Sequence, residues 1–166
     1  MDEQKEKSGK NYTDAELLKE VLRYDELWCE IIVKYGEWAK KQGISYHELM
    51  TAYSIWLAPC TQRDIVIRWG IPKQTVHSIL REFQKHNYIF LERSETDKRN
   101  KNIFFSEKGK EKFGPVMHRL IDLELRVWKR LKKEEARALL EFTEKYSACF
   151  REESREEETK FNAEQA

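Results

Sequence analysis

The sequence of 166 residues has little glycine, proline and cysteine, and each shortage excludes a class of protein. With six Gly and three Pro, the chain lacks the turn residues that an all-β fold needs, which favours long helices. The three cysteines, Cys29, Cys60 and Cys149, are far apart and fit a protein of the reducing cytoplasm. No apolar run approaches the roughly 18 residues of a membrane helix. The charged residues 1–10 are not followed by the apolar stretch of a signal peptide.

Motifs for catalysis, cofactors and metals are also missing from the sequence. It contains no glycine-rich phosphate loop, no H-E-x-x-H, no G-x-S-x-G and no internal repeat. His47 with Glu48, and His118 with Asp122, each supply two ligands, which is too few for a metal site. We therefore predict a protein that is not an enzyme and has no catalytic residue, no cofactor and no metal.

Charge is the property that the sequence has in excess. Charged residues make up 37% of the chain, against about 25% in an average domain. They nearly balance, for a net charge of +1, but they are unevenly distributed. Residues 61–112 hold twelve Lys and Arg against seven Asp and Glu, whereas the rest of the chain is acidic by four. A basic centre with acidic flanks is typical of a DNA-binding lobe joined to an association lobe, although ordinary fluctuation in a charge-rich chain remains the alternative.

Capping signals and apolar periodicity define the expected elements. Capping boxes begin at Thr13 and Ser45, residues 61–64 open a third, short helix, and we expect Pro72 at the first position of a fourth helix. The pattern predicts helices over 13–43, 45–58, 61–69 and 72–86, strands over 88–94 and 103–105, and helices over 107–131 and 133–150. Ala136, Leu139, Leu140, Thr143 and Tyr146 are expected to face inward on the last helix.

The predicted fold is mainly α with a small β-hairpin wing. Residues 45–106 form a winged helix-turn-helix lobe, and residues 13–43 and 107–150 form a helical dimerisation lobe. The whole chain, 1–166, is one such domain. The ends, residues 1–12 and 151–166, are expected to be flexible.

The fourth predicted helix has a polar face suited to the major groove. Its apolar stripe of Val76, Ile79, Leu80 and Phe83 leaves short donors and acceptors near its start and cations further along on the opposite side. Gln74 can pair with adenine, and Arg81 with guanine or phosphate. The predicted DNA-binding residues on this helix are Lys73, Gln74, Thr75, His77, Ser78, Arg81 and Lys85. A solvated helix face is the simpler alternative.

The tip of the predicted hairpin supplies the second DNA-binding element. It carries Asp97, Lys98, Arg99 and Lys101, and an arginine here can enter a minor groove, where the potential is most negative. Asp97 can orient Arg99 through a carboxylate–guanidinium pair. A solubilising turn is the alternative.

These segments resemble the MarR family of bacterial transcription regulators. The resemblance rests on residues 61–65, 71–80, 83 with 88–89, 97–99 and 103–109. It implies a homodimer on a pseudo-palindromic operator, with Arg99 in the minor groove and Thr61 and Gln62 on the DNA backbone. Asn87 stands where the family commonly has glycine, but Asn tolerates the left-handed conformation, so the turn should survive. Pro72 replaces a common serine cap.

Physical considerations also favour a dimer. The first helix and the last two carry apolar faces that a compact winged helix cannot cover, and a second copy would cover them. A two-fold dimer would place its recognition helices about 34 Å apart.

The family resemblance further implies a signal input. Trp28, Tyr35, Tyr53 and Trp56 could line a pocket for a small aromatic effector, although core packing is the simpler interpretation. Among the thiols Cys60, close to Arg63, is the better candidate for oxidant sensing.

We therefore predict a cytoplasmic, sequence-specific regulator that binds double-stranded DNA, a repressor relieved by a small ligand or another signal. The alternative is a winged-helix protein-interaction module without DNA binding.

Overall fold

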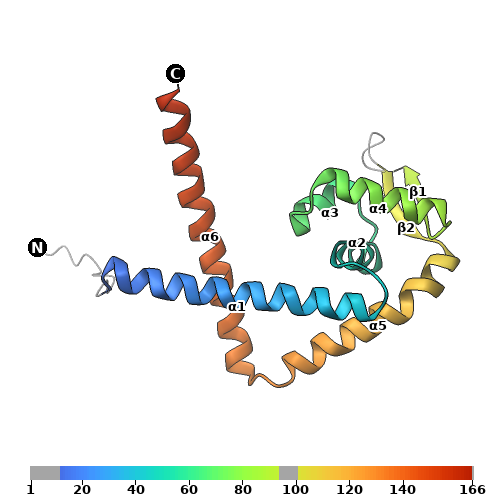
Figure 1. Cartoon of the computed structure of the whole chain (residues 1–166), viewed down its shortest axis with the longest axis horizontal. Helices are drawn as coiled ribbons and strands as arrows, with labels where there is room; N and C mark the ends of the chain where they lie inside the picture. Colours follow the sequence, from blue (N-terminus) through green and yellow to red (C-terminus); the bar gives the residue numbers. More distant parts are fainter. Residues whose placement is uncertain (1–11, 94–100, 166) are drawn as a thin grey trace, which may run out of the picture. The chain divides into compact units, whose positions relative to one another are not determined.

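The computed structural model describes residues 12–93 and 101–165, with the side chain of residue 93 excepted. In chain order the elements are α1 (Asp14–Lys41), α2 (Tyr46–Leu57), α3 (Gln62–Trp69), α4 (Lys73–Lys85), β1 (Ile89–Arg93), β2 (Lys101–Phe105), α5 (Glu107–Trp128) and α6 (Lys133–Glu164) (Figure 1). Contacts divide the chain into two compact units, Met1–Gly114 and Pro115–Ala166. The predicted mainly helical fold with one hairpin is confirmed.

The starts and ends of the first helices follow the capping signals. The side chains of Thr13, Ser45 and Thr61 each accept the N–H three residues on, and all three capping boxes are complete. Gly43 and Gly70 adopt φ of +76° and +61° at the ends of α1 and α3, a conformation in which glycine meets no steric penalty. We had expected Pro72 at the first helical position of α4, but it is the N-cap of that helix. Its carbonyl accepts the N–H of Val76 at 3.1 Å.

Helix α2 is the centre of the first unit. It contacts α1, α3, α4 and β2, and it buries Leu49, Ala52 and Ile55. Further buried side chains come from the other elements of this unit and from the segments between them: Ala39, Cys60, Ile65, Ile71, Val76, Leu80, Phe83, Ile89, Ile103, Phe105 and Phe113. Ile79, which was expected in the apolar stripe of the fourth helix, is only half-buried.

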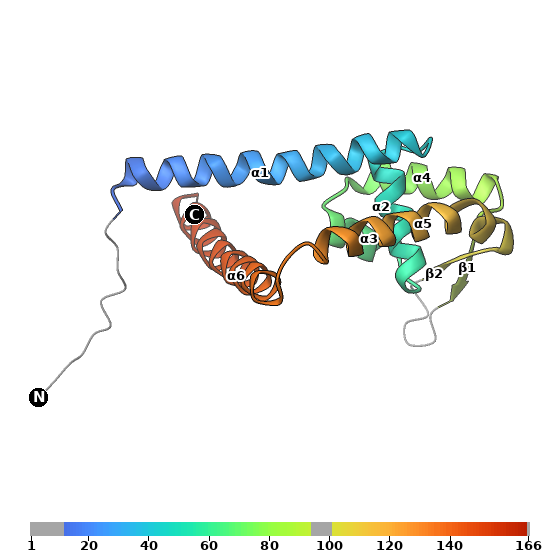
Figure 2. The same cartoon turned by 90° about the horizontal axis from the view of Figure 1, so that it is seen from below.

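The hairpin extends the helix-turn-helix. Strands β1 and β2 pair antiparallel, with Ile89 opposite Phe105 and Arg93 opposite Lys101. β1 contacts α4 and β2 contacts α2 (Figure 2). The Ile103 N–H also donates to the Cys60 carbonyl at 2.8 Å, which ties the segment before α3 to the free edge of β2. No pattern in the sequence predicted this bridge between Cys60 and Ile103.

The second unit differs from the prediction at its C-terminal end. α6 continues to Glu164, so the expectation that residues 151–164 fray is wrong. None of the residues of α6, all of which are described, is buried. Leu139, Leu140, Thr143 and Tyr146 are exposed rather than facing inward, and Ala136 is half-buried. Earlier in this unit Val116, Met117 and Leu120 are buried. The predicted grouping of residues 13–43 with 107–150 in one lobe stays a prediction.

Candidate nucleic-acid interface

Helix α4 separates an apolar side from a polar side. Val76, Leu80 and Phe83 are buried, whereas the residues predicted to meet DNA are exposed, apart from the half-buried Thr75. The exposed set is Lys73, Gln74, His77, Ser78, Arg81 and Lys85. The exposed side therefore offers amide, hydroxyl, imidazole and cationic groups on one helix that its buried stripe holds against the core.

The two residues predicted to touch the DNA backbone have different structural roles: Gln62 links α3 to α4, and Thr61 caps α3. Gln62 Nε2 donates to the Lys73 carbonyl at 3.2 Å and so connects the first turns of the two helices. Thr61 caps α3: its N–H and hydroxyl both donate to Asp64 Oδ2 at 2.8 Å. These two bonds lower the pKa of Asp64 below its usual value. The Gln62 bond was not predicted from the sequence, and the DNA contacts of both residues remain predictions.

The cations of α4 are not equally available. Glu82 Oε1 lies 3.2 Å from Lys85 Nζ and 2.9 Å from His86 Nε2, so Lys85 is partly neutralised. The same two contacts lower the pKa of Glu82, which therefore stays ionised at neutral pH. Arg81 and Lys73 form no ion pair within the described part of the chain. Arg81 is thus the cation in the middle of α4 with the most charge to offer a ligand.

The wing is described only in part. Asp97, Lys98 and Arg99 lie outside the described residues, so their predicted roles remain predictions. Lys101 is the first described residue after that gap, and it is exposed at the start of β2. On the outer face of the hairpin Phe90 and Phe104 stack, with ring centroids 5.5 Å apart and planes 14° apart.

Of the four residues proposed for an aromatic pocket, Trp28, Tyr53 and Trp56 make ring contacts, each with a different partner. Trp28 is 53% exposed and stacks on Tyr24. Tyr53 lies 6.2 Å from Trp69, and Trp56 lies 6.4 Å from Phe105, centroid to centroid. The half-buried Tyr35 also lies on α1. The effector pocket remains a prediction.

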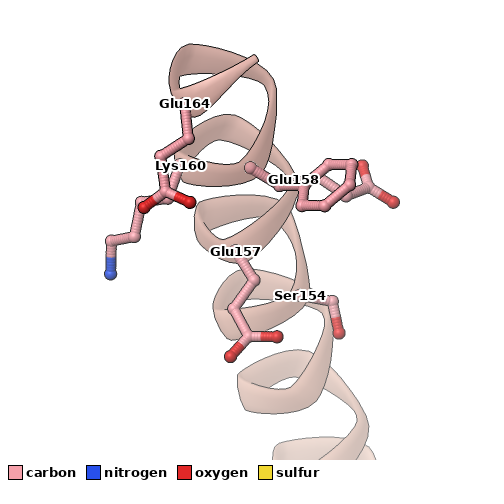
Figure 3. Close-up of a pocket in the computed structure, with 6 residues that line it drawn as sticks. Ser154, Glu157, Glu158, Lys160 and Glu164 are labelled. Carbon is pink, nitrogen blue, oxygen red and sulfur yellow. The ribbon is translucent and has the colours of Figure 1, made fainter.

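A shallow groove on α6 is one pocket that the described residues form. It is lined by Ser154, Glu157, Glu158, Lys160, Phe161 and Glu164. Figure 3 shows that these side chains all project from one helix, with no second element facing them. An open groove of this kind cannot surround a small ligand as a binding pocket does.

Cys60 does not fit the role of a reactive thiol. Its side chain is buried, and burial raises the pKa of the thiol to about 11, with Asp64 adding to the effect and Arg68 opposing it. Since the thiolate is the reactive form, the preference for Cys60 as an oxidant sensor is wrong. No group of three metal-ligating side chains lies together in residues 12–93 and 101–165.

Comparisons with known proteins agree with this geometry. Residues 42–100 match the model of the MarR family. The HTH-type transcriptional regulator SarZ of Staphylococcus epidermidis is 31% identical over 87 residues, which are 49% of this chain and 56% of SarZ. This chain thus spans just over half the length of that curated relative.

Solved structures show the same fold. NMB1585, a MarR family regulator from Neisseria meningitidis, superposes with a TM-score of 0.71 at 19% identity, covering 84% of this chain and 97% of that one. The S. aureus MepR–DNA complex gives 0.60 at 18% identity, over 78% and 96%. Over the described residues, no helix has the length and apolar character to cross a membrane. The element order, the hairpin and these superpositions show that this chain has the winged helix-turn-helix fold, and its residues 42–100 are similar to the MarR family.

Proposed function

We propose that the chain is a sequence-specific DNA-binding transcription regulator whose helix α4 enters the major groove. The observation that carries the proposal is the exposed face of α4, with Gln74, Ser78 and Arg81 free of core packing. Short polar side chains near the start of a helix suit base edges, and cations further along suit phosphates. The DNA-bound MepR relative, which has this fold, supports the same reading of α4.

We further propose that two copies of the chain form the functional regulator. On α1 the exposed Leu17, Val21, Tyr24, Trp28 and Ile31 recur at intervals of four and three residues, the spacing of a helix seam that packs against another helix. α6 exposes Leu139, Leu140, Phe142, Tyr146, Phe150 and Phe161 and buries nothing within its own chain. A 32-residue helix is stabilised chiefly by tertiary packing, so its apolar face requires a partner surface, and a second copy supplies one.

The dimer can be tested with substitutions that leave the protomer intact. Trp28→Glu and Leu139→Glu place a charge on faces that are already exposed in the protomer, so folding should persist while association fails. Ile67→Glu is the matched control, because Ile67 is 69% exposed on α3, outside both faces. Light scattering should give a dimer for the wild type and Ile67→Glu and a monomer for the other two. Dimers in all four would refute this assignment.

The finer parts of the proposal concern regulation. A cytoplasmic repressor that binds a pseudo-palindromic operator and releases it when a small aromatic effector binds would fit the family. The candidate residues for contacts with the effector are Trp28, Tyr35, Tyr53 and Trp56. The wing residues Asp97, Lys98 and Arg99 would meet the minor groove beside Lys101. Screening effectors requires a DNA-binding assay first.

The deciding measurement is fluorescence anisotropy of a labelled duplex from just upstream of the protein's own gene. A scrambled duplex is the control, and both are titrated across a salt series. Tight binding that prefers the native duplex and weakens steeply with salt is expected for a regulator. Binding to neither duplex at physiological salt, with no effector added, would favour a protein-interaction module instead.

A further inference from the structure

The residue that precedes α5 joins three parts of the winged helix. The Ser106 hydroxyl donates to the Asn87 carbonyl oxygen at 2.6 Å, with the Tyr88 carbonyl oxygen 3.2 Å away. The same hydroxyl oxygen accepts the N–H of Gly109, in the first turn of α5, at 3.1 Å. A hydroxyl can donate one bond and accept others at once, so Ser106 holds the first turn of α5 and the turn before β1 together.

The turn that Ser106 holds is itself fixed to the recognition helix. Asn87 adopts φ of +57°, as its sequence position predicted, and its N–H donates to the Gln84 carbonyl at 2.9 Å. The next N–H, that of Tyr88, donates to the Phe83 carbonyl at 2.8 Å. The carbonyls that Ser106 contacts therefore follow directly on the last turn of α4, and a shift of either helix end is transmitted to the other.

Close backbone packing surrounds the same point. The Ser106 N–H donates to the Tyr88 carbonyl at 2.9 Å. A Cβ added at Gly109 would overlap that same carbonyl oxygen, so the first turn of α5 lies directly against the start of β1. Below it, the Phe113 ring lies 4.8 Å from Phe83 and 5.3 Å from Phe105, centroid to centroid. The end of α4, the base of the hairpin and the start of α5 thus share one packed junction.

We propose that the Ser106 hydroxyl is a positioning group for DNA binding, which sets the direction of the hairpin relative to α4 through the Asn87 turn. The inference rests on the proposed DNA-binding function. A helix in the major groove and a wing beside it can contact one duplex together only if the angle between them is fixed. Ser106 does not touch DNA in this proposal: it acts through the two elements that do.

The test compares Ser106→Ala, which removes the hydroxyl, with Ser106→Thr, which keeps it. Ser45→Ala is the matched control. Ser45 is also a serine N-cap, and it accepts the Glu48 N–H at 3.2 Å, but its capping bonds stay within the first turn of α2. Thermal melting measures the stability of each full-length variant. Anisotropy with the native and scrambled duplexes measures DNA affinity well below the melting temperature.

Ser106→Ala should weaken binding to the native duplex about ten-fold, the equivalent of one hydrogen bond that orients the binding elements. Ser106→Thr should restore the affinity. Ser45→Ala should lower the melting temperature and bind DNA as the wild type does. Unchanged affinity in Ser106→Ala, or an equal loss in Ser45→Ala, would overturn the inference while leaving the proposed function in place. A wild type that binds neither duplex would overturn both.

Discussion

Arg81 offers the sharpest test of how α4 meets DNA. It is exposed in the middle of the helix and has no ion-pair partner in the described residues, so its full charge is available to a phosphate or a guanine. A dimer presents it twice. Each phosphate contact changes the slope of log affinity against log salt by about 0.9, so Arg81→Gln in both protomers should reduce the slope by about 1.8 if the side chain meets phosphate.

The two possible contacts of Arg81 give different results. A phosphate contact predicts equal losses of affinity on the native and scrambled duplexes. A guanine contact predicts a loss of discrimination worth about 1–3 kcal/mol at one position of each half-site, with a smaller change of salt slope. Both are measured by anisotropy at four or five salt concentrations. Arg23→Gln is the control, because it removes the same charge from α1, where Arg23 pairs with Glu26 at 3.0 Å.

Glu82 extends the same experiment. Glu82 lies 3.2 Å from Lys85 and is ionised at neutral pH, so Glu82→Gln should free the charge of Lys85 and raise DNA affinity. For the same reason Lys85→Gln should lower DNA affinity less than Arg81→Gln does. Arg81→Gln that leaves both the affinity and the salt slope at wild-type values would refute the assignment of α4 as the DNA-binding surface.

Two further predictions concern buried groups. The Thr51 hydroxyl is fully buried and has no hydrogen-bond partner among the described residues, so Thr51→Val should stabilise the protein by about 1 kcal/mol. Ser54→Ala should instead cost about 1–2 kcal/mol, since Ser54 Oγ accepts the Trp69 indole N–H at 2.7 Å. Melting at one fixed protein concentration separates them, and equal signs would contradict the reasoning. Separately, a thiol reagent at pH 8 should modify the exposed Cys29 quickly and Cys60 only after unfolding. The reason is that burial raises the pKa of the Cys60 thiol to about 11. Rapid labelling of Cys60 in the folded protein would contradict this prediction.

Local signals in the sequence predicted most of the fold because they act over three or four residues. The capping boxes at Thr13 and Ser45 and the polar residues 61–64 predicted three helix starts. The left-handed turn at Asn87 was implied by the family resemblance instead. The periodicity also identified the buried side of α4. The periodicity shows which side of a helix is apolar, but it does not show which surface packs against that side. Leu139 and Tyr146 were therefore expected inside, yet they are exposed in the protomer.

The C-terminal end of α6 shows a different limit of the sequence. Residues 151–164 hold six acidic and three basic residues, a composition that suggested fraying. Composition ignores order, however, and Glu156 precedes Lys160 by four residues, the spacing and direction that support a helix. The Ser154 and Thr159 hydroxyls also donate to carbonyls four residues back, at 2.7 and 2.8 Å, and so remain within the helix.

The side chains that orient α4 were harder to foresee than those that read DNA. Gln62 holds the first residue of α4 through the Lys73 carbonyl, and Ser106 holds the turn after its last residue through the Asn87 carbonyl. The bond from Gln62 joins residues 11 apart in the sequence, and the bond from Ser106 joins residues 19 apart. Each is accepted by a backbone carbonyl, which every residue has, so no residue type in the sequence marks the acceptor. Since both lie outside the buried stripe, their loss should alter the direction of α4 more than the stability of the core. Substitutions of Gln62 and Ser106 are therefore expected to weaken DNA binding while the protein still folds.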